Sequence, residues 1–205
     1  MSKAVLMSIR PSWVDKIASG EKTVELRKSW PRFMMVPFKV YIYMTKHEDR
    51  LIDVLHDGDT DYLGDTHHGK SVFIKIPEGS FQYQRGKVVG EFVCDAVSAL
   101  TFDRNNIPTL HYSGPAKPWR TCVTKEAALK YCGDAEERGL WAWHISELKM
   151  YRYDQAKDLT DFKRPCNLKP DCFLCKNWVF ANKDCKLNRG ITTAPKSWCY
   201  VEEQE

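Results

Sequence analysis

Residues 20–27 read Gly-Glu-Lys-Thr-Val-Glu-Leu-Arg, and the alternation of polar and apolar side chains here decides the first part of the fold. Successive side chains of a β-strand point to opposite faces of its sheet. Val24 and Leu26 are therefore expected to enter a core. Thr23, Glu25 and Arg27 then share the opposite face, where they form a polar wall suited to a ligand.

The preceding segment, residues 4–10, alternates in the same way. Met7 and Ile9 are apolar, whereas Ser8 and Arg10 fall on the polar side. The proline that follows fits the first turn of a helix, where its missing N–H costs nothing. We therefore expect a strand, a short helix and a second strand, whose polar faces line one cleft.

At these positions the chain resembles a known family. The GxKxxExR motif of the ASCH domain is matched by Gly20, Lys22, Glu25 and Arg27. The resemblance extends over residues 5–28 and continues at residues 86–100 and 121–148, so it covers roughly the first 150 residues. It implies an α+β fold: a small PUA-like (ASCH) β-barrel with short flanking helices. Members of this family bind RNA or hydrolyse modified nucleosides.

The hydrophobic pattern divides the rest of the chain. Further strands are expected at residues 38–44, 69–76, 87–96 and 140–148, and a second helix at residues 125–132. The polar stretches 46–70 and 103–120 are expected to be loops. We expect a domain at residues 1–150 and a C-terminal extension at residues 151–205.

Composition narrows the class of protein. Hydrophobic residues make up 43% of the 205 residues and charged residues 28%, which is ordinary for a soluble globular protein. We see no signal peptide and no apolar run of the ~18 residues that a membrane helix needs, so we expect a cytoplasmic protein that does not bind membranes. Residues 1–46 hold nine Lys or Arg and three Asp or Glu. Basic charge near a cleft favours a phosphate-bearing partner, although it is also typical of a solvated surface.

The predicted cleft offers candidates for catalysis and for binding. Lys22 could act as a nucleophile or base if its pKa is lowered. A charged Lys22 would instead hold a phosphate or polarise a carbonyl. Thr23 would exchange hydrogen bonds, and Glu25 would act as a general base or simply form a salt bridge. The expected ligand contacts come from polar, basic and aromatic side chains: Ser8, Arg10, Arg27, Tyr43, Trp119 and Arg120. Aromatic faces stack on bases, but core packing is the usual role of a tryptophan.

The family resemblance bears on the reaction. Some ASCH-type enzymes remove the acetyl group from N4-acetylcytidine with a lysine, a threonine and a glutamate. Lys22 matches that lysine, whereas Glu25 stands at the position of the threonine. Glu91 is a candidate second carboxylate on a later strand.

Five of the eight cysteines lie in the last 40 residues. Four of them have the spacing C-x5-C-x2-C-x9-C: Cys166, Cys172, Cys175 and Cys185. A Cys-x-x-Cys turn presents two thiolates to one ion, and four thiolates make a closed structural Zn²⁺ site. A redox pair at Cys172 and Cys175, or thiols without a ligand, are the alternatives. Cys199 lies in an expected closing strand, and the three dispersed cysteines, Cys94, Cys122 and Cys132, are expected to be buried.

An ASCH-like domain followed by a cysteine-containing tail is similar to ASCH proteins of phages and prophages. Three functions stay open at this point. The first is a module that binds a nucleotide or RNA in the basic cleft. The second is a hydrolase that acts on a modified nucleoside or on RNA through Lys22 and Glu25. The third is a zinc-stapled module that binds a protein partner.

Overall fold

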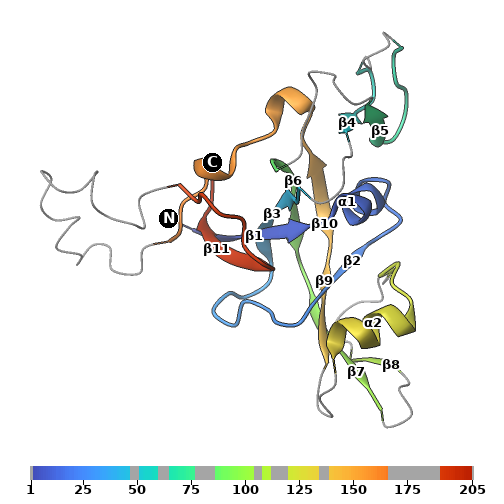
Figure 1. Cartoon of the computed structure of the whole chain (residues 1–205), viewed down its shortest axis with the longest axis vertical. Coiled ribbons are helices and arrows are strands. Elements are labelled where there is room, and N and C mark those ends of the chain that lie inside the picture. Colours follow the sequence, from blue (N-terminus) through green and yellow to red (C-terminus); the bar gives the residue numbers. More distant parts are fainter. Residues whose placement is uncertain are drawn as a thin grey trace, which may run out of the picture.

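The computed structural model describes residues 2–46, 51–59, 65–76, 86–103, 108–111, 120–133, 139–165 and 190–204. These residues form a mixed α+β fold that consists mostly of strands (Figure 1). The elements, in chain order, are β1 (Lys3–Ile9), α1 (Pro11–Ala18), β2 (Val24–Arg27), β3 (Phe38–Met44), β4 (Leu51–Leu55), β5 (Val72–Ile76), β6 (Val88–Cys94), β7 (Val97–Phe102), β8 (Pro108–His111), α2 (Lys125–Cys132), β9 (Leu140–His144), β10 (Ser146–Met150) and β11 (Trp198–Glu202). Two 3₁₀ turns, Tyr153–Gln155 and Leu159–Asp161, follow β10.

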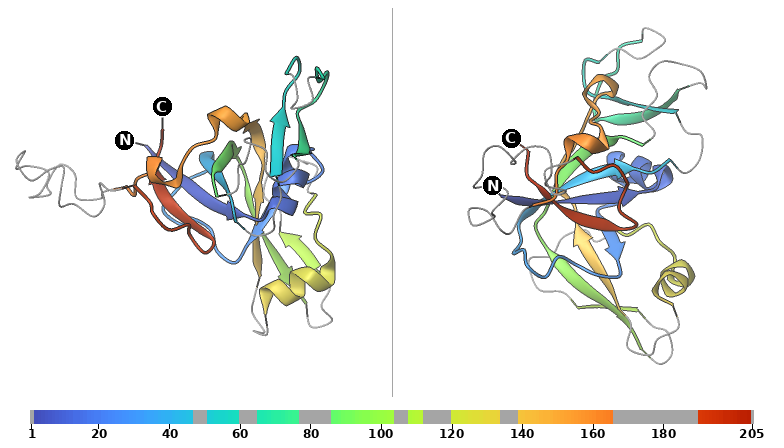
Figure 2. Two further views of the ribbon diagram at one scale, coloured as in Figure 1. Left: turned by 45° about the horizontal axis from the view of Figure 1, so that its top comes forward. Right: turned by 60° about the vertical axis from the view of Figure 1, so that its left-hand side comes forward.

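The strands form three sheets. The first has five strands in the order β10-β6-β3-β1-β11, the second has four in the order β2-β9-β7-β8, and β4 pairs with β5. The β4-β5 hairpin lies at one end of the molecule, and α2 lies with β7 and β8 at the other (Figures 1 and 2). The predicted α+β class is confirmed. The pairings of the described strands leave both large sheets open, and they do not show a closed barrel.

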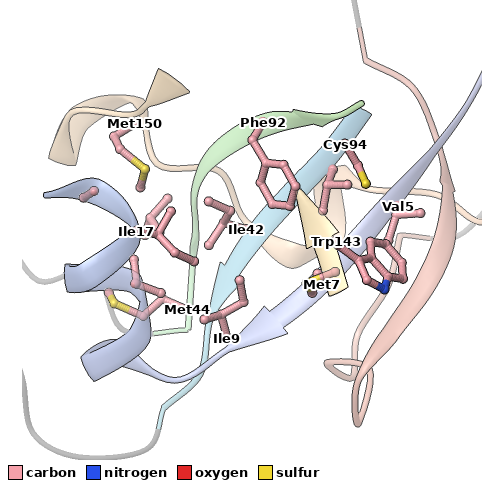
Figure 3. Close-up of a cluster of buried hydrophobic side chains, with 14 of the residues drawn as sticks. Val5, Met7, Ile9, Ile17, Ile42, Met44, Phe92, Cys94, Trp143 and Met150 are labelled. Atoms are coloured by element: carbon pink, nitrogen blue, oxygen red, sulfur yellow. The ribbon is translucent and has the colours of Figure 1, made fainter. Parts of the chain in front are cut away.

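One face of the five-stranded sheet carries the main core (Figure 3). Val5, Met7 and Ile9 of β1 are at most 1% exposed and pack beside Ile42 of β3. Helix α1 covers this face through an apolar side that includes Ile17. The core also takes in Trp143 of β9, so both large sheets enclose it.

The opposite face of this sheet is also buried. Leu6 of β1 and Tyr41 of β3 pack there against Phe162, which follows the second 3₁₀ turn. Strand β11 pairs antiparallel with β1, and Cys199 and Val201 of β11 belong to the same cluster. Described residues beyond residue 150 therefore pack on, and pair with, the sheet that carries the first strand.

A third cluster fixes the orientation of β2. Val24 and Leu26 are buried beside Ala128 of α2 and Ala142 of β9. The predicted alternation of β2 is confirmed, because Val24 and Leu26 share this cluster, whereas Glu25 and Arg27 pair with each other at the cleft. All four residues of β2 are buried, so its polar face is enclosed rather than solvated.

Several expected boundaries differ from the observed ones. Strand β4 lies inside the expected loop 46–70, and β8 inside the expected loop 103–120. Those two predictions were wrong because each polar stretch contains a short segment that pairs with a neighbouring strand: the apolar Leu51–Leu55 pairs with β5, and Pro108–His111 pairs with β7. The single strand expected at 140–148 is two strands, β9 and β10, which belong to different sheets and are separated at Ile145.

Four cysteines lie in the part of the chain that the structure describes, and none of the four is in a disulfide. Cys94 and Cys132 are buried as expected, and so is Cys199 in β11. Burial raises the pKa of the Cys199 thiol and keeps it protonated. The burial expected for Cys122 was wrong, because it is exposed in the loop before α2 with φ at +55°. No described helix is long and apolar enough to span a membrane.

Candidate functional site

A cleft of about 740 Å³ opens where β1, α1 and β2 meet. Its lining includes Ser8 and Arg10 from the end of β1, and Glu25 and Arg27 from β2. Helix α2 contributes one side, and the segment that precedes β11 contributes another through Lys196. The cleft therefore unites residues from both ends of the chain, and the expected convergence of two polar strand faces is observed.

A buried ionic triad forms the floor of the cleft. The Lys22 Nζ atom lies 3.3 Å from Glu25 Oε2, and Arg27 Nη2 lies 3.1 Å from Glu25 Oε1. The side chains of Lys22, Glu25 and Arg27 are 1%, 9% and 8% exposed, respectively. One carboxylate thus serves two cations, and the floor carries a net positive charge away from bulk water.

Lys22 is held by further contacts. Its ammonium donates a hydrogen bond of 2.6 Å to the Thr121 carbonyl oxygen and lies 5.0 Å from the centre of the Trp13 ring. Its backbone N–H donates to the Lys16 carbonyl oxygen at the end of α1. These contacts satisfy a charged group that would be costly to bury alone. They also hold the Lys22 ammonium in one position, as a binding or reacting group requires.

Arg27 connects the floor to two walls of the cleft. Its Nη2 atom also donates to the Ser8 carbonyl oxygen at 2.8 Å, and Nη1 donates to Ser197 Oγ at 3.4 Å. The Ser8 hydroxyl donates in turn to the Pro195 carbonyl oxygen at 2.7 Å. The segment before β11 is therefore tied to β1 and β2, which fixes the position of the wall that carries Lys196.

Three cations lie around the floor: Arg10, Lys46 and Lys196. The Lys46 side chain has a defined position, because its methylene groups lie across Gly86, whose φ is +74°. A Cβ atom at residue 86 would come within 2.6 Å of Lys46 Cε. Gly86 is anchored to β3 through a hydrogen bond from its N–H to the Met44 carbonyl oxygen. The glycine thus leaves room for a lysine stem that ends in the cleft.

Aromatic side chains complete the lining. Trp13 of α1, Tyr43 of β3 and Tyr131 of α2 face the cleft from three elements. Burial raises the pKa of the Tyr43 phenol, so this group stays neutral and keeps its hydrogen. Flat apolar faces beside fixed cations suit a ligand with a planar ring and an anionic group.

Some predicted residues lie elsewhere. The Thr23 hydroxyl accepts a hydrogen bond of 2.9 Å from the Arg120 N–H, and the Arg120 guanidinium donates to the Gly20 carbonyl oxygen. Neither of these residues lines the cleft; they join β2 to the loop before α2. Glu91 accepts a short hydrogen bond from the Tyr151 hydroxyl, outside the cleft.

The remaining predicted site residues, Trp119, Cys166, Cys172, Cys175 and Cys185, lie outside the described residues. Among the described residues, no three His, Cys, Asp or Glu side chains are grouped as metal ligands.

Sequence reasoning missed part of the lining. Lys46 and Thr45 follow directly after β3, and Lys196 lies about 170 residues from the motif along the chain. The only local indication of Thr45 and Lys46 was the prediction that Tyr43 contacts the ligand, because the residues that follow Tyr43 in the chain then become candidates for the lining. Nothing local to Lys196 indicates its position, because tertiary pairing of β11 with β1 places it there.

Comparisons of the chain with protein-family models, with curated proteins and with solved structures found no match.

Proposed function

We propose that this protein binds a nucleotide, alone or as part of single-stranded RNA, in the cleft above the Lys22–Glu25–Arg27 triad. The observation that carries the proposal is the charge of the lining. Among the described residues, the lining holds five cationic side chains, Arg10, Lys22, Arg27, Lys46 and Lys196, and one carboxylate, that of Glu25. An anionic ligand would compensate this excess, and a phosphate is the anion that RNA and nucleotides supply.

The arrangement of the lining supports a division of roles. The triad lies at the floor, where desolvation suits hydrogen bonding to a polar base edge. Lys46 and Lys196 lie in the two walls that flank it, where a phosphate stays partly hydrated. Tyr43 or Tyr131 offers a face on which a base stacks, a contact worth about 1–3 kcal/mol per base.

We propose further that residues 1–150 form an ASCH-like domain of the PUA-like group. The GxKxxExR motif supports this, since three of its four residues, Lys22, Glu25 and Arg27, form the triad at the floor of the cleft. The two open sheets also enclose one core, as the walls of a small barrel do.

Binding of a short single-stranded RNA and of a nucleoside monophosphate at several salt concentrations tests the proposal. Each phosphate contact to single-stranded RNA adds about 0.7 to the slope of log K against log salt. The variants Lys46→Ala and Lys196→Ala should each weaken binding and lower the slope by about that amount. Lys149→Ala is the matched control, because this lysine is exposed on β10 and does not line the cleft. Equal effects in all three variants would contradict a cleft-specific phosphate contact.

A second function, hydrolysis of an acylated or otherwise modified nucleoside, is supported by one specific observation. Lys22 and Glu25 form a buried pair, 3.3 Å apart, in the same cleft. Glu25 would take a proton from water while Lys22 polarises a carbonyl oxygen of the ligand. Mass spectrometry of acylated and unmodified nucleosides after incubation tests this. A product that is formed by the native chain and lost in both Lys22→Ala and Glu25→Gln, while circular dichroism shows both variants folded at the assay temperature, would establish it.

We also propose that Cys166, Cys172, Cys175 and Cys185 bind one structural Zn²⁺. The described residues that flank this segment support a stapled loop, because Lys163 and Gly190 pair antiparallel and so bring its two ends together. Metal analysis of the purified chain, beside a Cys172→Ser and Cys175→Ser double variant, tests this. One equivalent of zinc that the double variant lacks is the expected result.

A further inference from the structure

A short loop presents large apolar side chains to solvent. Among the described residues, four large apolar side chains are exposed, and three of them, Phe33, Met35 and Val36, lie between β2 and β3. Phe33 is 88% exposed and Met35 is 89% exposed. Contiguous apolar exposure of this kind marks an interaction surface, whereas single exposed apolar residues are normal.

This apolar loop, residues 31–37, has a defined shape. The Met34 N–H donates to the Pro31 carbonyl oxygen at 3.0 Å, which closes a turn around Phe33. Met34 packs against the main core, and the preceding Trp30 lies 5.6 Å from Trp141, centre to centre. The turn is thus held at both sides, and Phe33 and Met35 point outward because the neighbouring residues are anchored.

A groove of about 700 Å³ lies next to the loop. One wall is the loop itself, and Phe38 of β3 and Val93 of β6 also line the groove. The groove runs across the ends of β1, β3, β6 and β10, which are neighbours in the five-stranded sheet. A protruding apolar loop and a groove lined by both apolar and charged side chains therefore share one face of the molecule.

The charges in the groove indicate what occupies it. Its lining carries both signs: Lys3 and Lys39 on the one hand, and Asp95, Glu147 and Glu203 on the other. Lys39 already pairs with Glu203 at 3.3 Å, and Asp95 with His144 at 2.6 Å. Lys3 and Glu147 are exposed and have no ion-pair partner among the described residues. With the exposed Arg32 of the loop, this face carries three cations and three acidic groups, and a surface of mixed sign without a basic excess is poorly suited to RNA or an anionic membrane.

A second copy of the same chain fits this pattern. In a twofold interface, residue i of one copy contacts residue j of the other, and j contacts i. A loop beside a groove then fills the partner's groove and receives the partner's loop. Under the same symmetry, Lys3 of each copy can pair with Glu147 of the other copy, which gives two intermolecular ion pairs.

We propose that residues 31–37 and the adjoining groove form the interface of a symmetric homodimer, independently of what the cleft binds. Phe33 and Met35 would be the central contacts, since large buried side chains at the centre of an interface carry most of its affinity. Lys3 and Glu147 would fix the orientation of the two copies.

Sedimentation velocity of the full chain over about two decades of concentration tests the proposal. The native chain should shift from monomer to dimer, and Phe33→Glu or Met35→Glu should weaken dimerisation by at least about tenfold. Both side chains are nearly fully exposed, so the fold should survive, as circular dichroism would verify. Lys149→Glu, a charge change outside the groove, should have no effect.

Exchanging the charges of Lys3 and Glu147 distinguishes this interface from any other. Lys3→Glu and Glu147→Lys should each weaken the dimer, and the two together should restore it. A native chain that stays monomeric at every concentration would overturn the proposal. So would a dimer that is insensitive to Phe33→Glu, or one that the combined charge exchange fails to restore.

Discussion

Replacing Glu25 by glutamine probes the centre of the cleft directly. The change keeps the shape of the side chain and removes the one carboxylate that faces both Lys22, at 3.3 Å, and Arg27, at 3.1 Å. Both cations are at least nine-tenths buried and would then face each other without a counter-charge. Removing one partner of a buried ion pair costs about 3–5 kcal/mol. We therefore expect Glu25→Gln to lower the free energy of unfolding by about that amount.

Urea unfolding followed by circular dichroism measures this loss. For a chain of this size, about 3–5 kcal/mol corresponds to a drop in Tm of about 6–20 °C. Glu21→Gln is the matched control, because Glu21 also pairs with a lysine at 3.2 Å, but its side chain and that of Lys16 are 61% and 42% exposed. A surface pair contributes about 0–1 kcal/mol. Equal losses in Glu25→Gln and Glu21→Gln would refute the reasoning that burial makes the triad essential.

Three further predictions concern other parts of the molecule. Gly86→Ala should displace Lys46 and weaken nucleotide binding to the level of Lys46→Ala, because the new Cβ atom would lie 2.6 Å from Lys46 Cε. Isothermal titration calorimetry with both variants checks this, and an unchanged affinity in Gly86→Ala would contradict it. The free energy of unfolding should fall as pH rises above about 10, because burial raises the pKa of Tyr151 in the folded state while the unfolded phenol ionises near its ordinary value. Tyr151→Phe should flatten this pH dependence in urea unfolding at neutral and alkaline pH, and an unchanged slope would show that other groups cause it. Chelation should release one zinc per chain and expose the C-terminal segment to protease while nucleotide affinity stays; zinc content and cleavage sites measure this, and loss of nucleotide binding would count against a purely structural metal.

The sequence predicts the cleft well where local alternation decides it. Glu25 and Arg27 share a face of β2 because their spacing is two, and Ser8 and Arg10 at the end of β1 follow the same rule. The orientation of the strands toward each other then follows from the buried residues between them. Alternation therefore predicts which side chains share a face, whereas packing against α2 and β9 brings the two faces together.

Local reasoning fails where pairing between distant segments decides the structure. Strand β4 is a short apolar segment, Leu-Ile-Asp-Val-Leu, inside a polar stretch, and because the flanking residues are polar a loop was expected where a strand pairs with β5. Lys196 reaches the cleft because β11 pairs with β1 and the Ser8 hydroxyl ties the Pro195 carbonyl to β1. Thr23 belongs to the polar face by alternation, yet its hydroxyl is engaged by the Arg120 N–H.

Photochemical crosslinking of a short single-stranded RNA, with the crosslinked peptides mapped by mass spectrometry, locates the bound nucleotide. A nucleotide in the cleft should give crosslinks to its aromatic lining, Trp13, Tyr43 or Tyr131, and these should be lost in the Lys46→Ala and Lys196→Ala double variant. Crosslinks confined to peptides outside the cleft, or crosslinks to the cleft that persist unchanged in that double variant, would contradict this prediction.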